Sequence, residues 1–536
     1  MKRLLIVATL LVALFSLTGC PSPNTPGTLP YTPNSWLIVM YMDADNNLND
    51  SIWTDIYNTQ IGLAYAMNAE GSAESGYPDL KVIMLWDGWN EDSCQELRDE
   101  HTYAIIRPAK TRIHPRSELY ELRPMDQNTY DAVNASGNPD KTWRMSSISR
   151  RLTNSVTWLP EEPDMGNVST LTNLLTWVNN NYNAEHKVLV LNNHGAGTEQ
   201  EAGSGGAFYH RSLCSDDTNS TDQSVRSLTA TDVKNAIANS GFHPKVIWMD
   251  CCLQGNVETT YILRGSADYL VTSANVSYSN NYYRIISNLN NVNTPLEFAK
   301  TVASSYAATH ASNTLDISST SVTDLGTRRS SYERTLTQAV YNLDVGKQGL
   351  LYGTIDALAG AILSENETVK NRIFTEYLNQ TRTSVQNCKG MAYPGTAVYL
   401  SDIGYFCNKL ISDSSLSVTI KNCAQNVVSA LNNVIESSWM GKYVVSYDSD
   451  TAANPIPTLS TNFYYKKNLD SVAGTSDYDA SDGQFGLTIM TQTYDNRFNN
   501  GYYYFLTEYN DFTGYSPNWG QLLDYWYNTI SNPQNP

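Results

Sequence analysis

Basic residues are scarce in this sequence, and so are several other features that define common classes of protein. Only 35 Lys and Arg stand against 53 Asp and Glu, which gives a formal net charge of −18 at pH 7. An acidic chain of this kind is a poor match for nucleic acid or for an anionic membrane surface. No two cysteines have the Cys-x-x-Cys spacing of structural zinc sites. Beyond the N-terminus, no apolar run reaches the roughly 20 residues of a membrane-spanning helix. We therefore expect no nucleic-acid partner, no structural zinc and no later membrane span.

The N-terminus does carry one strongly apolar segment. Two basic residues precede a run from Leu4 to Phe15, and Leu-Thr-Gly then leads to Cys20. This order is typical of a secretory signal, and its last four residues resemble a bacterial lipobox. Residues 1–19 are predicted to be a lipoprotein signal peptide, and residues 20–34, with five prolines, an extended tether. The protein would then be exported and attached through lipidated Cys20 to the bacterial cell envelope, at the outer or cell-surface membrane. Signal cleavage nearby without lipidation is the alternative.

Short apolar runs alternate with segments of helical periodicity in the first 330 residues. The predicted strands are 36–42, 82–86, 188–191, 246–249 and 269–274, and the predicted helices are 43–67, 169–181, 229–238, 256–264 and 295–308. This alternation favours an α/β domain with a mostly parallel central sheet over residues 35–330. Residues 331–536 are predicted to be a C-terminal helical and mixed α+β region. In it, helical periodicity continues to about Ser438, before Tyr-rich strand segments and a final helix near 519–530.

Two of the apolar runs end in reactive side chains. One leads to His194 and Gly195, and the other leads to Asp250, Cys251 and Cys252. In a parallel sheet, sites are built at the carboxyl ends of the strands, so an imidazole and a thiol are expected to face each other across one crevice. A cysteine attacks carbonyl carbons as the thiolate, and a neighbouring histidine lowers the thiol pKa and later protonates the leaving amine. Covalent cysteine catalysis is therefore the chemistry that this arrangement predicts.

Together with three further stretches, these residues resemble the clostripain-like cysteine peptidases of the caspase and gingipain clan. The stretches are WLIVMYMDADNNLN from Trp36, DMGNVSTLTNLLTWV before the histidine run, and VTDLG from Val322. The family pattern is an apolar block with His-Gly, followed by a second block with Asp-x-Cys. The resemblance extends from about Trp36 to the C-terminus and is weaker after residue 330. It implies a caspase-like αβα sandwich, with His194 as the base and Cys252 as the nucleophile. Cys251 occupies a position where the family usually has Ala, and we expect it to pack away from the crevice.

The resemblance also implies an oxyanion hole formed by the backbone N–H groups of Gly195 and Cys252. The expected activity is that of an endopeptidase that cleaves a peptide or protein substrate through a thioester. The family needs no third catalytic residue, so Asp250 is expected to be structural and to orient the adjacent loop or the histidine. Two alternatives use the same fold: a catalytically degenerate surface binding protein, and another Cys-His acyl-transfer enzyme such as an amidase or transpeptidase. Retention of both His194 and Cys252 argues against the first, and the second stays open.

The segment after the first predicted strand has part of the spacing of a calcium-binding loop. Asp43, Asp45 and Asn47 stand at alternate positions. However, Leu48 replaces the glycine of such a loop, and Thr54 replaces its bidentate glutamate. A loop that caps the following helix is the default expectation. The sequence therefore predicts no metal ligands and no required cofactor, and calcium has only this partial support.

The sequence also bears on which side chain precedes the cleaved bond. The best-known relatives cut after Arg or Lys, using an acid downstream of the cysteine, but here no Asp or Glu occurs between Asp268 and Glu297. Without a carboxylate partner, a buried basic side chain is costly. We expect an uncharged side chain in a pocket lined by some of Ser273, Asn275, Ser277 and Tyr278. The alternative is an acid from elsewhere, such as Asp87, Asp268 or the C-terminal region.

A polar segment joins the histidine run to the cysteine run. Residues 198–227 are rich in Gly, Ser, Asp and Asn, which favours a mobile surface loop beside the crevice. Cleavage in this loop, at Arg211 or Arg226 if another protease performs it, is a hypothesis for activation.

Overall fold

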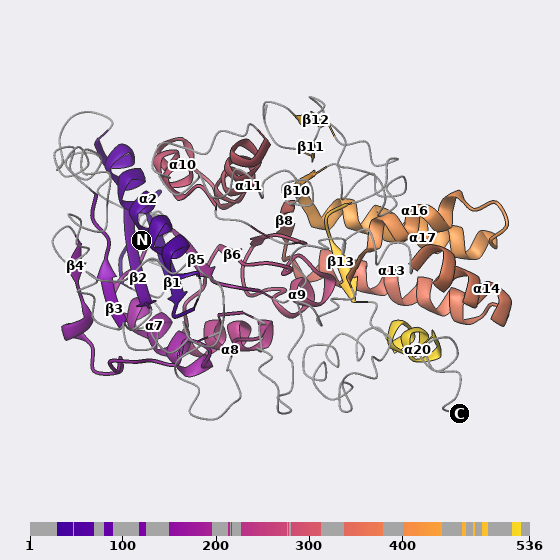
Figure 1. Cartoon of the computed structure of the whole chain (residues 1–536), viewed down its shortest axis with the longest axis horizontal. Helices are drawn as coiled ribbons and strands as arrows, with labels where there is room; N and C mark the ends of the chain where they lie inside the picture. Colours follow the sequence, from indigo (N-terminus) through magenta and orange to yellow (C-terminus); the bar gives the residue numbers. More distant parts are fainter. Residues whose placement is uncertain are drawn as a thin grey trace, which may run out of the picture.

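The computed structural model of the 536-residue chain describes its central sheet and most of the helices that cover the sheet (Figure 1). The described residues are 29–46, 48–68, 80–88, 117–124, 149–195, 213–214, 216, 227–275, 277, 280–311, 337–378, 400–441, 464–467, 475–477, 485–490 and 517–526. The predicted signal peptide and Cys20 lie outside these residues, as do Tyr278, Arg211 and Arg226. The predictions made for them therefore stay predictions.

An eleven-stranded sheet runs through the described residues, in the order β12-β11-β10-β8-β7-β6-β5-β1-β2-β3-β4. The five strands from β7 to β2 are parallel to one another. The strands are β1 (Trp36–Ala44), β2 (Leu80–Gly88), β3 (Ser117–Glu121), β4 (Arg150–Arg151), β5 (His186–Asn192), β6 (Val246–Asp250), β7 (Tyr269–Thr272), β8 (Thr337–Asn342), β10 (Ile435–Gly441), β11 (Tyr464–Lys467) and β12 (Thr475–Asp477). A second sheet pairs β9 (Leu400–Asp402) with β13 (Thr488–Met490). The parallel strands at the centre confirm the predicted α/β class.

Helices cover both faces of this sheet (Figure 1). One face packs against α2 (Asn49–Asn68), α10 (Tyr282–Ser287) and α11 (Pro295–Ala311). The other packs against α7 (Val168–Asn181), α8 (Ala230–Ser240) and α9 (Val257–Ile262). Alternate residues of a strand point to opposite faces, so Leu37 and Val39 join the α7–α8 core while Ile38 and Met40 join the α2–α11 core. Both cores contain fully buried side chains, which explains why the central strands are apolar throughout rather than alternating.

The C-terminal half contributes a group of helices beside the sheet. These are α13 (Val345–Leu363), α14 (Glu367–Arg372), α16 (Ile403–Ser412), α17 (Val418–Val434) and α20 (Pro517–Trp526). The described residues also form three short helical turns elsewhere in the chain and beside these helices. They are η1 (Thr153–Ser155), η2 (Leu289–Asn291) and the π-helical turn η3 (Ile373–Leu378). In Figure 1 the main helices of this group lie at the end of the molecule away from β4, with α17 packed on α13 and α16.

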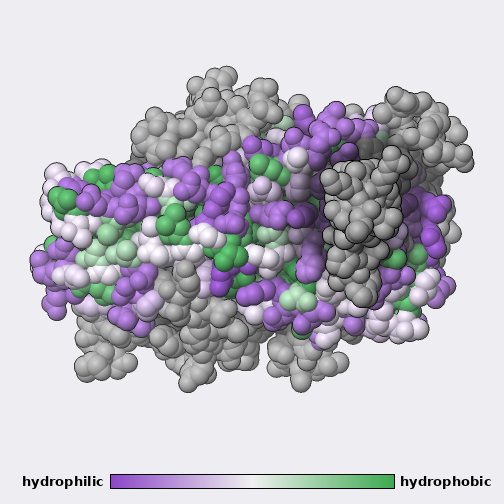
Figure 2. All heavy atoms as spheres, turned by 180° about the vertical axis from the view of Figure 1, so that it is seen from behind, coloured by the Kyte–Doolittle hydropathy of each residue, from purple (hydrophilic) through white to green (hydrophobic). Residues whose placement is uncertain are grey.

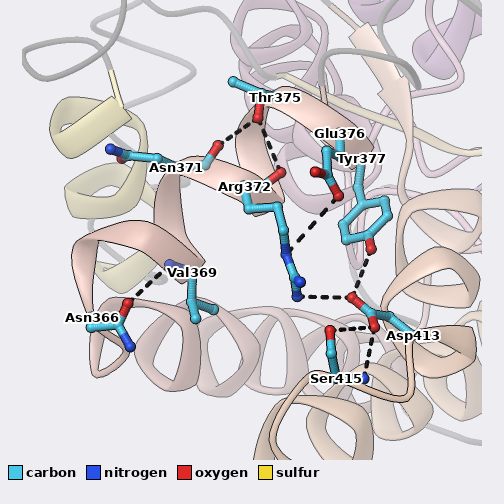
Figure 3. A network of polar contacts seen from close by, with 9 residues as sticks. All are labelled: Asn366, Val369, Asn371, Arg372, Thr375, Glu376, Tyr377, Asp413 and Ser415. Carbon is cyan, nitrogen blue, oxygen red and sulfur yellow. Dashed lines mark hydrogen bonds and ion pairs between the residues drawn. The ribbon is translucent and has the colours of Figure 1, made fainter.

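A polar network joins η3 to the turn between α16 and α17 (Figure 3). Asp413 accepts hydrogen bonds from Tyr377 Oη at 2.7 Å and from Ser415 Oγ at 2.6 Å, and it pairs with Arg372 Nη2 at 2.9 Å. Burial would raise the pKa of Asp413, but the donors of Ser415 and Tyr377 and the charge of Arg372 together lower it to about 2. The turn is therefore held by an ionised carboxylate at neutral pH.

The structure differs from the sequence predictions in three places. Strands β8 and β10 occupy residues where helical periodicity was expected, because they pair with β7 and with each other and so extend the main sheet past residue 330. Helix α10 begins at Tyr282, between the predicted strand 269–274 and the predicted helix 295–308, where a loop was expected. Strands β3 and β4 lie in the irregular, polar segment 91–165, where the sequence indicates only short strand-like pieces and gives no bounds for these two strands. Short strands and single helical turns take their structure from tertiary pairing, which periodicity does not report.

On the face in Figure 2, hydrophobic side chains are dispersed among polar ones instead of forming one broad patch. No helix among the described residues is both long enough and apolar enough to cross a bilayer.

Candidate active site

The register of β5 and β6 brings the predicted base and nucleophile to the same level of the sheet. The two strands are parallel neighbours, and Asn192 at the end of β5 pairs with Asp250 at the end of β6. His194 and Cys252 each follow two residues later, and both are half-buried at the carboxyl edge of the sheet. The structure therefore places the imidazole-bearing and thiol-bearing segments side by side, as the sequence predicts.

The backbone of Gly195 touches the backbone of Cys252. A Cβ built on Gly195 would be 2.2 Å from the carbonyl oxygen of Cys252, 2.9 Å from its amide nitrogen and 3.0 Å from Cys251 Cβ. Only glycine permits this approach, because any side chain would overlap the cysteine turn. The amides expected to form the oxyanion hole thus belong to two segments in direct contact.

The two adjacent cysteines have different environments. Cys251 is 1 % exposed, and its Sγ lies 3.5 Å from the carbonyl oxygen of Leu191. Burial, followed by the nearby charge of Asp250, raises the pKa of the Cys251 thiol well above its ordinary value. Cys252 is half-buried, and its Sγ accepts a hydrogen bond from the Ser277 amide at 3.3 Å. Its Sγ also lies 3.7 Å from the Ser277 carbonyl oxygen. Because Cys252 is partly exposed whereas Cys251 is buried with a raised thiol pKa, Cys252 is the better placed nucleophile of the two.

The turn that carries Cys252 is held from two sides. Leu253 has φ +62°, an uncommon conformation for a side chain of this size, and its amide donates to the Asn275 carbonyl at 3.0 Å. The amide of Gly255 donates to Ser273 O at 2.8 Å, and its carbonyl accepts from Thr488 N at 3.0 Å. The C-terminal strand β13 therefore fixes the residues immediately after the nucleophile.

The histidine segment is positioned by a residue that the sequence analysis did not identify. Asn193 Oδ1 accepts from the backbone N–H of His194 and from Asn46 Nδ2, the latter at 3.1 Å, and Asn193 Nδ2 donates to Asp43 Oδ2. All of these groups except the histidine are buried. Asp43 near the end of β1 and Asn46 just beyond it thus hold the histidine turn, and the Asn-Asn pair before His-Gly is the sequence signal that could have indicated this contact.

Asp250 contacts the pocket segment rather than the histidine. Its carboxylate accepts from Asn280 Nδ2 at 2.6 Å, from Tyr282 Oη at 3.1 Å and from Asn192 Nδ2 at 3.4 Å. Asn192 Nδ2 also lies 3.0 Å from Asp55 Oδ2. Burial raises the pKa of Asp250 to about 6, and burial together with the charge of Asp250 raises the pKa of Asp55 well above its ordinary value. Between the expected alternatives, these contacts favour the role in which Asp250 orients the adjacent loop.

The predicted pocket residues divide into two groups. Ser273 is fully buried, and its Oγ lies 2.9 Å from Thr337 Oγ1 of β8, so it supports the sheet. Asn275 is also buried. Ser277 is half-buried and contacts the Cys252 sulfur through its backbone. Of the three predicted pocket residues that the structure describes, Ser277 is the one brought to Cys252.

Neither acid that sequence analysis offered as an alternative partner for a basic substrate lies at this pocket. Tyr269 pairs with Val246, so Asp268 is at the amino end of β7, where it forms an ion pair with Lys245 at 3.2 Å. This is the edge opposite to the cysteine, which excludes Asp268. Asp87 ends β2, which is separated from β6 by β1 and β5, and it accepts a hydrogen bond from Ser117.

The segment 198–227 was expected to be a mobile surface loop, and its described residues contradict that expectation. Leu213 and Cys214 are fully buried, and Asp216 is 2 % exposed. Leu213 forms antiparallel bridges to Gly195 and Leu228. This part of the segment is therefore packed against the candidate active site.

Comparison with known proteins agrees with this geometry. Clostripain from Hathewaya histolytica is 25 % identical over 245 residues, which cover 45 % of this chain and 39 % of clostripain. The matched region is thus less than half of that relative's length. A solved structure of a secreted C11 cysteine protease from Bacteroides thetaiotaomicron, in complex with an irreversible peptide inhibitor, superposes with a TM-score of 0.50. At 15 % identity, over 91 % of this chain and 99 % of that one, this similarity supports the caspase-like fold.

A model of the clostripain family matches residues 40–526. This range includes the histidine segment, the cysteine turn and the C-terminal strand that holds it. Since the match covers most of the sequence, the chain belongs to the clostripain family.

Proposed function

We propose that this protein is an exported, lipid-anchored cysteine endopeptidase that uses Cys252 as nucleophile and His194 as general acid and base. The observation that carries the proposal is the contact between the Gly195 and Cys252 backbones at the carboxyl edge of β5 and β6. Membership of the clostripain family supports the peptidase activity. The lipobox-like residues before Cys20 support the anchor.

The proposed reaction proceeds in two halves. The Cys252 thiolate attacks the carbonyl carbon of the peptide bond, and the negative charge that develops on oxygen is stabilised by the amides of Gly195 and Cys252. Collapse breaks the carbon–nitrogen bond, the amine takes a proton from the His194 imidazolium, and an acyl thioester remains. Water then adds to the thioester and gives a proton to His194, and the Cys252 thiolate leaves with its electron pair.

The test of this mechanism uses neighbouring cysteines as target and control. Cys252→Ala should abolish both peptide hydrolysis and labelling by a peptidyl acyloxymethyl ketone, because no thiolate remains at the crevice. Cys251→Ala should keep most activity, because Cys251 is buried against Leu191. His194→Ala should reduce turnover by a factor of about 10²–10⁴, which is the usual contribution of a general acid–base group. Equal losses from the two cysteine changes would contradict the assignment, and labelling of Cys252 without peptide cleavage would favour an amidase or transpeptidase.

We also propose that the residue before the cleaved bond is uncharged. No acid occurs between Asp268 and Glu297, and Asp268 lies at the other edge of the sheet. In the described part of the pocket segment, the Ser277 amide contacts the Cys252 sulfur. Asn280 donates a hydrogen bond to one oxygen of the buried Asp250 carboxylate. A positional-scanning peptide library is the measurement. Preferred cleavage after neutral residues would support the proposal, and a strong preference for Arg or Lys would refute it.

The anchor is tested separately from catalysis. Mass spectrometry of protein purified from the membrane fraction should identify a diacylglyceryl group on Cys20 as the first residue. Cys20→Ala should abolish lipid attachment and leave the hydrolysis of a soluble peptide unchanged, because residues 20–34 precede the first strand of the catalytic sheet. An unmodified Cys20 in the membrane-derived protein would refute the lipid anchor.

A further inference from the structure

The segment before the first strand is fastened to the amino edge of the central sheet, which is the edge where its parallel strands begin. Three hydrogen bonds do this: His186 N to Ser35 O at 3.0 Å, Asn34 N to Glu185 Oε2 at 2.7 Å, and Asn183 Nδ2 to Leu29 O. Residues 29–35 therefore lie against the turn that leads into β5. The active site is at the other edge, where β5 and β6 end.

This attachment limits where the proposed lipid anchor can hold the protein. Cys20 is nine residues before Leu29, and a chain spans at most about 3.6 Å per residue, so the two residues are within roughly 30 Å of each other. A strand rises about 3.3 Å per residue, so the chain from His186 to His194 places the catalytic edge roughly 25 Å from the amino edge. A tether of this length, attached at the amino edge, favours an orientation in which that edge is nearer to the lipid.

Exposed hydrophobic side chains gather at the same edge. Single residues of this kind are common on protein surfaces, but four of the six large ones exposed in the described residues lie here. They are Leu29, Tyr31, Tyr65 in the last turn of α2 and Val345 at the start of α13, which are 38 %, 56 %, 55 % and 58 % exposed. Helix α2 connects the parallel strands β1 and β2, so its last turn is at the amino edge. Helix α13 follows the end of β8, which pairs with the start of β7.

The charged residues at the two edges of the sheet also differ. Lysines stand at the beginning of three parallel strands: Lys81 in β2, Lys187 in β5 and Lys245 just before β6. Aspartates stand at or near the other ends of three: Asp43 in β1, Asp87 in β2 and Asp250 in β6. In a chain with a formal charge of −18, the edge that begins with lysines is the one that an anionic lipid surface repels least. A lysine can also extend its ammonium group to a phosphate along its apolar stem.

We propose that the amino edge of the sheet, with residues 29–35 docked on it, lies on the bilayer that holds Cys20, and that His194 and Cys252 therefore point away from the membrane. The proposal rests on the lipid anchor proposed above and gives it an orientation. The partner is the headgroup layer of a phospholipid bilayer, which accommodates tyrosine rings and lysine ammonium groups at the boundary between lipid and water. A peptidase held in this way acts on polypeptides in the surrounding solution.

The test compares two forms of the full-length protein by hydroxyl-radical footprinting with mass spectrometry. One is the lipidated protein in vesicles of phosphatidylethanolamine and phosphatidylglycerol, and the other is the soluble Cys20→Ala protein. Burial among headgroups excludes water from a side chain, so Tyr31 and Tyr65 should be oxidised at least about threefold more slowly in the vesicle-bound form. His194 at the catalytic edge is half-buried and should be oxidised at the same rate in both forms.

A pair of variants tests whether the apolar side chains make the contact. Tyr31→Asp combined with Tyr65→Asp adds charge at two exposed positions, so the vesicle-bound double variant should oxidise Leu29 as fast as the soluble protein does. Val418→Asp is the matched control, because Val418 is 68 % exposed at the end of α17 remote from β10. It should leave Leu29 protected.

The outcomes separate the orientation from the functions on which it rests. Equal oxidation of Tyr31 and Tyr65 in the two forms, or protection of His194 in their place, would overturn the orientation while the lipid on Cys20 and the peptidase activity stand. Protection of Leu29 that survives the double change would overturn the contact through these side chains. An unmodified Cys20 would refute the anchor, and the orientation with it.

Discussion

Replacing Gly195 with alanine should abolish most catalysis while leaving the rest of the fold in place. The added Cβ would lie 2.2 Å from the Cys252 carbonyl oxygen, whereas ordinary contacts begin at 3.4 Å. The two backbones would have to separate by more than 1 Å, since the atom in the way belongs to the main chain and has no alternative rotamer. The displacement would fall on the two amides that the mechanism assigns to the oxyanion.

The expected loss follows from what such a displacement does to catalysis. Misplacement of reacting groups by about 1 Å can reduce turnover about 10²-fold. Loss of one oxyanion donor reduces kcat by about 10²–10³, which corresponds to about 3–4 kcal/mol. Gly195→Ala should therefore reduce kcat by about 10²–10³, with a smaller change in KM, because the oxyanion forms only in the transition state.

The assay is steady-state hydrolysis of a fluorogenic peptide, together with thermal unfolding to confirm folding. The control is Gly353→Ala in α13, where a Cβ meets nothing within 4 Å. That change should keep full activity and stabilise the helix by up to about 1 kcal/mol. Activity of Gly195→Ala within threefold of the unchanged protein would refute the reasoning. An equal loss from Gly353→Ala would show that the assay reports general stability rather than the site.

Two further predictions concern stability. The pKa of Asp250 is raised to about 6 in the folded state, and the pKa of Asp55 is raised well above its ordinary value. Both carboxyls therefore keep a proton at pH values where the unfolded chain has released it. As a result, the free energy of unfolding should fall as pH rises from about 4 through 6. Asp55→Asn should make this fall smaller in urea unfolding, because it removes one of the two carboxyls whose pKa is raised; an identical pH dependence would contradict the raised pKa of Asp55. Trp526 is fully buried in α20, and its Nε1 donates to Lys370 O at 3.1 Å. Trp526→Ala should lower the free energy of unfolding by about 3–5 kcal/mol, and a loss below 1 kcal/mol would show that α20 is not anchored by this side chain.

The sequence could predict the central strands and the order of the candidate site because both depend on local patterns. Four-residue and longer apolar runs mark β1, β2, β5 and β6, and the reactive side chains follow the last two directly. Parallel pairing then brings these strand ends to one edge without further information. The amino-acid sequence alone therefore places His194 and Cys252 at the same edge of the sheet, and the pairing of β5 with β6 shows that their strands are neighbours.

Other features arise only when distant segments meet. Strand β8 reads TQAVYN, a mixed sequence whose extended form comes from pairing with β7 and β10. The bonds from Asn193 to Asp43 and Asn46 join the end regions of β5 and β1, which are far apart in sequence and share no sequence pattern. The carboxylates of Asp45 and Asp87 likewise meet, although Asp45 follows β1 and Asp87 is near the end of β2. Contacts of this kind are set by tertiary structure, to which periodicity and spacing within one segment are insensitive.

The bonds between Thr488 and Gly255 have a consequence for when the enzyme can become active. Thr488 supports the nucleophile turn through both its amide and its hydroxyl, at 3.0 and 3.2 Å from the Gly255 carbonyl. Its strand is held by Asp402, which accepts from the amides of Phe485 and Gly486. A ribosome makes these residues more than 230 positions after Cys252. A nascent chain that is still being synthesised therefore carries His194 and Cys252 without the strand that holds the cysteine turn. Such a chain should be inactive toward the proteins around it until the residues around Thr488 have emerged and folded back.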